Sequence, residues 1–121
     1  MSTLTKKDYC DYETCVALSE LGCPVPKYAT INIHTKEKEW KMWISLYDAQ
    51  KWLREEKKIE VNASFDKEDD GWIAFIQRLD YPDLCGTDVF STVYNTYESA
   101  LLVSINEAVK ILKEENNERI Y

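Results

Sequence analysis

Residues 95–117 have the spacing of an amphipathic helix, and this segment constrains the fold more than any other. Six apolar residues recur every three or four positions and so share one helix face: Leu101, Leu102, Ile105, Ala108, Val109 and Leu112. Asn95 and Glu98 stand three residues apart at its start, where their side chains can bond open backbone N–H groups. A helix of this kind predicts a folded domain with an apolar surface beneath it.

Length and composition fit a single globular domain spanning residues 1–121. A chain of 121 residues buries roughly two-thirds of the surface that its unfolded form exposes. Its net charge of −7 repels phosphate backbones, and the lysines near positions 36–41 and 57–58 lie beside glutamates rather than in a basic patch. We therefore expect no nucleic-acid partner.

The N-terminal residues lack the apolar run of a signal peptide. No segment approaches the roughly 18 consecutive apolar residues that a membrane span needs. The sequence thus predicts a cytoplasmic protein with no membrane partner, in a compartment that keeps thiols reduced.

Two further helices are predicted upstream of the terminal one. The first covers residues 12–21 and ends at Gly22, which adopts left-handed backbone readily, while Pro24 and Pro26 prevent its continuation. The second begins at Asp48 or slightly earlier and ends at about Lys57, with an apolar stripe of Ala49, Trp52 and Leu53.

Alternating apolar and polar residues predict five strands, over residues 29–34, 40–46, 59–65, 71–79 and 88–94. The first two are close enough to form a hairpin, and Asp70-Gly71 marks a hairpin turn between the third and fourth. The order α-β-β-α-β-β-β-α indicates an α+β fold. We expect one mixed, mainly antiparallel sheet of about five strands, with three helices mostly on one face.

Metal and cofactor sites are not expected. Asp66, Glu68, Asp70 and Gly71 match the first half of a calcium loop, but Gln77 stands where that loop needs a bidentate glutamate, so a solvated hairpin turn is the better interpretation. The four cysteines, Cys10, Cys15, Cys23 and Cys85, have no pair with zinc-ligand spacing. They are expected to pack as small apolar residues, although Cys85 could be a reactive thiol in a loop.

Catalytic motifs are also missing from the sequence. A triad would have to use His34, the single histidine, and three scattered glycines cannot form a phosphate-binding loop. Asp80, Asp83 and Asp88 flank the longest loop and are the first candidates for a paired-acid site. Turn formation explains them more simply, because aspartate bonds its own backbone in turns.

The aromatic residues suggest an interaction surface. Trp43 is out of phase with Trp40 and Met42, so its side chain points to the other face of the strand. Trp72 is out of phase with Ile73 and Phe75 in the same way. A sheet face carrying Trp43, Trp72 and Ile76 would be a sizeable apolar patch if no helix covered it. The alternative is a sheet that the chain itself covers on both faces.

Three short segments, in order along most of the chain, carry a resemblance. They are Glu13 with residues 17–22 (ALSELG), residues 52–55 (WLRE) and residues 97–100 (YESA). Together they resemble a class of small uncharacterised proteins from the genomes of gut bacteria and of their phages and mobile elements. The resemblance implies a bacterial or phage setting and an accessory role, and it supplies no catalytic residues.

Two functions remain open from the sequence. The first is a small acidic, non-catalytic accessory protein that acts by binding another protein or by forming a homodimer. The second is a small-ligand-binding module or enzyme that uses the aromatic sheet face and the loop from Asp80 to Asp88. The first is preferred because catalytic motifs are missing and aromatic residues are abundant.

Overall fold

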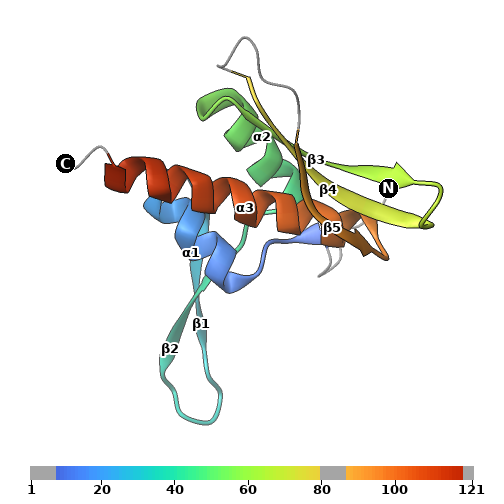
Figure 1. Ribbon diagram of the computed structural model, residues 1–121. Helices are drawn as coiled ribbons and strands as arrows, with labels where there is room; N and C mark the ends of the chain where they lie inside the picture. The colour runs from blue at the N-terminus through green and yellow to red at the C-terminus, as the bar shows by residue number, and fades with distance from the viewer. Residues whose placement is uncertain (1–7, 80–86, 119–121) are drawn as a thin grey trace.

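The computed structural model describes residues 8–79 and 87–118, and Figure 1 shows the arrangement of their helices and strands. The elements in chain order are α1 (Tyr12–Glu20), β1 (Lys27–Ile31), β2 (Lys38–Met42), α2 (Leu46–Glu56), β3 (Ile59–Asp66), β4 (Gly71–Arg78), β5 (Thr87–Tyr94) and α3 (Tyr97–Glu118). The predicted α+β class and the predicted order of elements are both confirmed.

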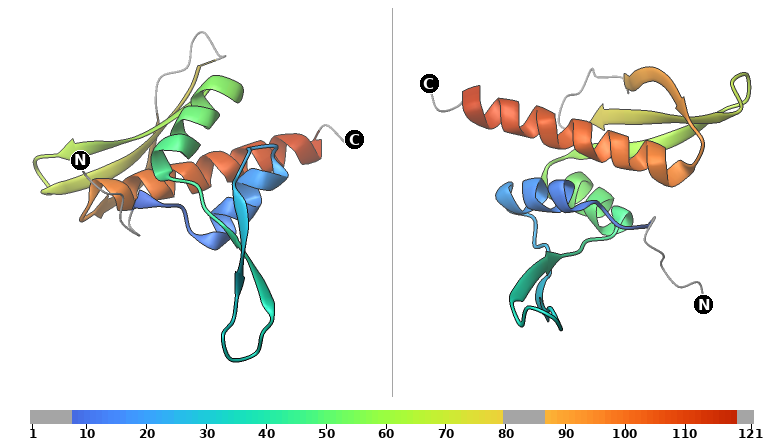
Figure 2. Two further views of the ribbon diagram at one scale, coloured as in Figure 1. Left: turned by 180° about the vertical axis from the view of Figure 1, so that it is seen from behind. Right: turned by 90° about the horizontal axis from the view of Figure 1, so that it is seen from below.

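The strands form two sheets, where one sheet of about five strands was expected. β1 pairs only with β2, while β3, β4 and β5 form an antiparallel sheet in that order. Alternation of apolar and polar residues shows which side chains share a strand face, but it does not show which strands pair. The β1–β2 hairpin, residues 27–42, extends away from the remaining elements (Figures 1 and 2).

Both strands of this hairpin end earlier than predicted because polar side chains beyond them form hydrogen bonds with backbone N–H groups. The Asn32 side chain accepts hydrogen bonds from the N–H groups of His34 and Thr35, at 2.9 and 3.1 Å, which turns the chain after Ile31. His34 is therefore in a turn and not in a strand. Downstream, Ser45 accepts a bond from the Asp48 N–H and α2 starts at Leu46, in agreement with a predicted start at Asp48 or slightly earlier.

α3 lies across one face of the three-stranded sheet, as Figure 2 shows. The residues on that face are buried and paired in register: Val61 with Ile76 and Ala63 with Ala74. Five of the six predicted residues of the α3 stripe are buried against them, namely Leu101, Ile105, Ala108, Val109 and Leu112. The predicted apolar face of the terminal helix is thus confirmed, with the sheet as its partner.

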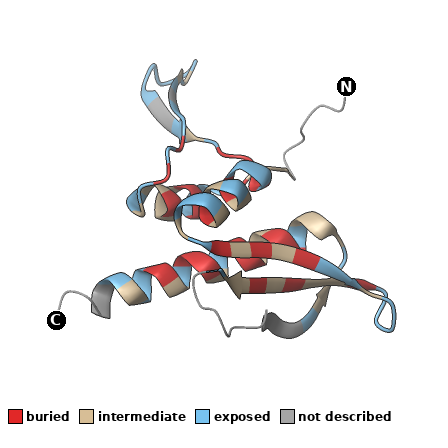
Figure 3. Ribbon diagram, turned by 90° about the horizontal axis from the view of Figure 1, so that it is seen from above, coloured by how far each residue is buried: buried red, intermediate tan, exposed pale blue. Residues whose placement is uncertain are grey.

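α1 and α2 complete the core on the other sides of α3. One continuous buried cluster includes Leu18 of α1, Leu53 of α2 and Ile105 of α3, and the buried stripes are visible in Figure 3. Polar contacts also join the layers. The Thr14 hydroxyl of α1 lies 2.6 Å from the Asn106 side chain of α3, and Arg78 of β4 forms an ion pair with Glu115 of α3.

The outer edge of β3 is closed by side chains. Gln50 of α2 donates a hydrogen bond of 2.8 Å to the Val61 carbonyl, and the Asn62 side chain accepts one of 2.8 Å from the Ala63 N–H. These bonds occupy backbone groups that would otherwise be open to another strand. The three-stranded sheet is therefore protected at this edge.

Candidate functional site

The structure separates the three residues that were predicted to share an open sheet face. Ile76 is only 6% exposed and lies in the core beneath α3, so it does not belong to an interaction surface. Trp72 lies on the same helix-covered side and is half-buried between the rings of Phe65 and Tyr97, with ring centroids 5.2 and 5.3 Å apart. The prediction assigned the open face to the wrong side of β4, because apolar residues occupy both sides of that strand.

Trp43 is accessible, with 46% of its surface exposed. It follows the end of β2, and its ring packs edge-on against Tyr9 with the centroids 5.0 Å apart. The backbone around it is fixed by hydrogen bonds from Trp43 N–H to the Pro26 carbonyl and from Cys10 N–H to the Ile44 carbonyl. Trp43 therefore stands at the base of the β1–β2 hairpin on a rigid backbone.

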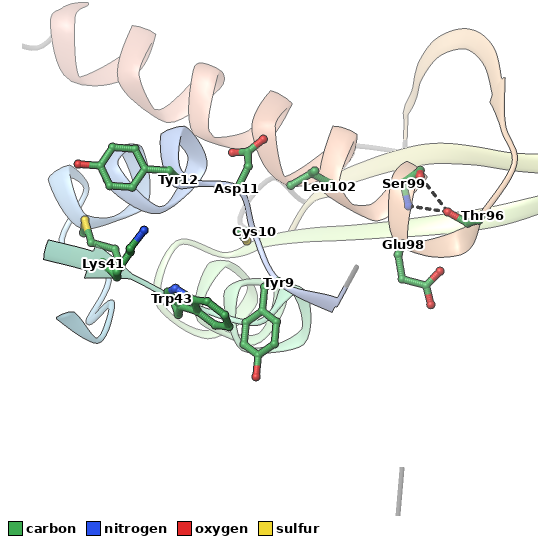
Figure 4. A pocket seen from close by; sticks show the side chains of 11 residues that line it. Tyr9, Cys10, Asp11, Tyr12, Lys41, Trp43, Thr96, Glu98, Ser99 and Leu102 are labelled. Carbon is green, nitrogen blue, oxygen red and sulfur yellow. Dashed lines mark hydrogen bonds between the residues drawn. The ribbon is translucent and has the colours of Figure 1, made fainter. Parts of the chain in front are cut away.

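A pocket of about 740 Å³ opens beside Trp43, and Figure 4 shows its lining. The residues come from three places: the segment leading into α1, the end of β2 and the first turns of α3. Tyr9, Met42, Trp43 and Leu102 supply its apolar surface. Pockets of this size and character are typical of ligand or peptide sites.

Charged groups stand around this apolar surface. Asp11 and Glu98 contribute carboxylates and Lys41 an ammonium group. The Asp11 carboxylate is already engaged, because it accepts bonds from the Thr14 N–H at 2.8 Å and the Thr14 hydroxyl at 2.5 Å as the cap of α1. Glu98 extends from the first turn of α3 and points away from Asp11 (Figure 4). The pocket is thus apolar inside and carries two acids and one base at its rim.

The comparisons with known proteins give no relative from which a role could be transferred. No family model, curated protein or solved structure matches the chain. The site must therefore be interpreted from its own geometry.

The described residues also offer neither a group of metal ligands nor a membrane-spanning helix. In the part of the chain that the structure describes, no group of three histidine, cysteine or acidic side chains is placed to hold a metal ion. Over the same residues, no helix has the length and apolar character needed to cross a membrane.

Three cysteines lie in the core, and one of them, Cys10, also lines the pocket. Cys10, Cys15 and Cys23 are buried free thiols. Burial raises the pKa of all three, and that of Cys23 rises to about 11, with Cys15 and Asp48 contributing further. A thiol that stays protonated is a weak nucleophile and a weak metal ligand, so packing is the role that the structure supports for them.

Two of the three acids proposed for a paired-carboxylate site, Asp80 and Asp83, lie outside the described residues, and so does Cys85. Asp88 belongs to the backbone of β5, where it pairs with Phe75. The pocket in the structure is lined by Tyr9, which the sequence did not single out, and by Leu102, which was predicted only as part of the apolar face of the terminal helix.

The β1–β2 hairpin was predicted, and the antiparallel pairing of β1 with β2 confirms it, but its separation from the other strands was not predicted. Ile31 is 68% exposed and Ile33 85% exposed, although both belong to the strand that was predicted over residues 29–34. The turn at Asn32 carries Ile33 beyond the end of the strand. Asn32 is the residue that could have indicated the early end of β1, because asparagine side chains commonly bond the backbone in turns.

Proposed function

We propose that the protein is a small non-catalytic accessory protein that acts by protein–protein interaction through its β1–β2 hairpin, with another protein or with a second copy of itself. The observation that carries this proposal is the exposure of Ile31 and Ile33 on an element that extends from the core. An isolated two-stranded hairpin is marginally stable in water, so a partner that covers it would also stabilise it. Trp43, at the base of the same hairpin, adds a further exposed apolar side chain beside the pocket.

This proposal places the protein in the cytoplasm of a bacterium, in keeping with the resemblance to small proteins of bacterial and phage genomes. Exposed large apolar residues that lie together commonly mark protein–protein contacts, and aromatic residues often contribute much of the binding energy. Of the residues predicted to form an interaction surface, the proposal keeps Trp43 and leaves out Ile76.

Affinity capture from a bacterial lysate tests the proposal with matched baits. We expect the wild-type protein to retain partners that the double variant Ile31→Ser/Ile33→Ser loses. Leu79→Ser is the control, because Leu79 is an exposed apolar residue outside the hairpin, at 47% exposure. The same set of captured proteins for all three baits would rule out the hairpin as the binding element.

A second candidate is a small-ligand-binding module, which the 740 Å³ pocket favours. Its apolar lining with a few charged groups at the rim suits an organic molecule with an apolar body and a cationic end. A thermal-shift screen of amines and other metabolites at millimolar concentration would test it. A melting temperature that stays constant across such a screen would argue against this function.

A further inference from the structure

We infer that the partner of the β1–β2 hairpin is a second copy of this chain, whose pocket beside Trp43 receives the hairpin tip. The inference rests on the proposed function, because both require the hairpin to be a binding element. It adds a definite occupant, a definite receiving surface and a two-fold arrangement.

Charge separates the hairpin from the remainder of the protein. Residues 27–42 contain four lysines and two glutamates, which gives a formal charge of +2. Because the whole chain carries −7, the remainder carries −9. The excess comes from Lys27 and Lys41 at the base of the hairpin, because residues 31–39 contain two lysines and two glutamates. The negative body of a second copy would attract this arm at long range and so orient association, while local charge pairs would fix the contact at the tip.

The chemistry of the pocket matches that of the hairpin tip. The tip presents the apolar side chains of Ile31 and Ile33 and two exposed charged residues, Lys36 and Glu37. The pocket presents Trp43 and Leu102, with Glu98 and Lys41 at its rim. The isoleucines would therefore meet an apolar surface, while Lys36 would meet the Glu98 carboxylate and Glu37 the Lys41 ammonium group.

The position of the pocket makes the contact reciprocal. Lys41, Met42 and Trp43 place the pocket at the base of the hairpin, roughly 20 Å from its tip at about 3.3 Å per residue. Two hairpins lying antiparallel around a two-fold axis would each reach the base of the other. Such an interface uses the same patch on both subunits, as two-fold dimers do.

Within the described residues, β1 and β2 pair with each other alone, so both strands of the hairpin lie at a sheet edge. At β3, in contrast, the side chains of Gln50 and Asn62 bond backbone groups of the outer edge. Open edges are sites where another chain can add strands. The hairpin therefore offers strand edges for association that β3 does not.

Analytical ultracentrifugation across a range of protein concentrations tests this inference. We expect a monomer–dimer equilibrium in the wild-type protein and in Leu79→Ser, and at least a roughly tenfold weaker dimer in Ile31→Ser/Ile33→Ser. Circular dichroism would verify that each variant is folded. A wild-type protein that stays monomeric, or a dimer that the double variant leaves unchanged, would overturn the inference.

A charge exchange between two variants identifies the receiving surface. Lys36→Glu and Glu98→Lys should each dimerise roughly tenfold more weakly, since like charges then face each other twice in each dimer. Mixed in equal amounts, the two variants should form a heterodimer of about wild-type affinity, because both contacts again join opposite charges. Mixing without such recovery would show that Lys36 and Glu98 do not meet.

The two proposals can fail separately. A monomeric protein whose hairpin captures a different protein, with that capture lost in Ile31→Ser/Ile33→Ser, would refute self-association and support the proposed function. A pocket that binds an amine in a protein that remains monomeric would also refute self-association.

Discussion

At the scale of single residues, the buried cysteines show how environment sets chemistry. Cys10, Cys15 and Cys23 belong to the same apolar core cluster, and the Cys15 thiol lies 3.8 Å from the Cys10 carbonyl oxygen. Burial is the main reason that the pKa of each thiol is raised, because an apolar surrounding disfavours the thiolate. These thiols are expected to react with alkylating reagents only after unfolding.

The raised pKa of Cys23 predicts that stability falls in alkali. Its ordinary pKa is 9.0 and its folded pKa is about 11, so the folded protein holds this proton more tightly. The contribution is complete below about pH 9 and is lost as the pH rises through 11. Urea unfolding from pH 8 to pH 11 should show a steeper loss of unfolding free energy in wild type than in Cys23→Ala. Equal slopes would contradict the assignment.

Gly71 leaves no space for a side chain. A Cβ atom at this position would collide with Cγ1 of Val93 and lie 3.0 Å from the Tyr94 carbonyl oxygen. We expect Gly71→Ala to lower the free energy of unfolding by about 1–3 kcal/mol, the usual cost of overpacking. Denaturant unfolding would measure it. The double variant Gly71→Ala/Val93→Ala should recover part of the loss relative to Val93→Ala, and strict additivity of the two changes would show that Val93 is not the obstacle.

The residues around this turn show what local sequence can predict. Asp70-Gly71 was predicted to mark a hairpin, and the chain does turn there, with Asp70 in the left-handed region at φ 51° and β3 paired to β4. The contact between Gly71 and Val93 could not be predicted, because it joins residues far apart in the chain. The orientation of Trp72 and Ile76 was missed for the same reason, since only the position of α3 decides which side of β4 is covered.

At the scale of elements, helix starts depend on single capping residues. α3 was predicted over residues 95–117 with Asn95 as its cap, but it begins at Tyr97. The Thr96 hydroxyl accepts a bond of 3.1 Å from the Ser99 N–H and also contacts the Ser99 side chain. Asn95 is exposed and stands one residue outside this arrangement.

This difference predicts that substitutions at two neighbouring positions lower the free energy of unfolding by unequal amounts. Thr96→Ala removes the acceptor for the Ser99 N–H and should lower the free energy of unfolding by about 1 kcal/mol. Asn95→Ala changes an exposed side chain and should alter it by less than about 0.5 kcal/mol. Chemical denaturation of both variants would measure the two effects. A larger loss in Asn95→Ala would restore Asn95 as the cap.

Prediction was most accurate where an element has a strong local pattern. The starts of α1, β3 and β4 were predicted to the residue, and their ends within one. β1 and β2 each begin two residues before the predicted positions, and they end three and four residues before them. The early ends have a local reason, because Asn32 and Ser45 bond the backbone and compete with continuation of the strand.

At the scale of the whole molecule, the structure has a core built around α3 and a hairpin that extends from it (Figure 1). The sequence predicted that the terminal helix would cover a sheet, and it does. It could not show that the first two strands leave that sheet, because the pairing of strands depends on contacts between distant segments. The pocket was hidden for the same reason, since its lining comes from Tyr9, Trp43 and Leu102 in three separate segments.

This division predicts that core and hairpin respond differently to loss of apolar side chains. Ile105 of α3 is fully buried, so Ile105→Ala should lower the free energy of unfolding by about 2–5 kcal/mol. Ile31→Ser/Ile33→Ser removes two apolar side chains that are mostly exposed and should change the monomer by no more than about 1 kcal/mol. Urea unfolding at a protein concentration below that of self-association would measure both. A loss in the hairpin variant as large as that in Ile105→Ala would mean that the isoleucines stabilise the fold itself, and their exposure could then no longer support a binding role.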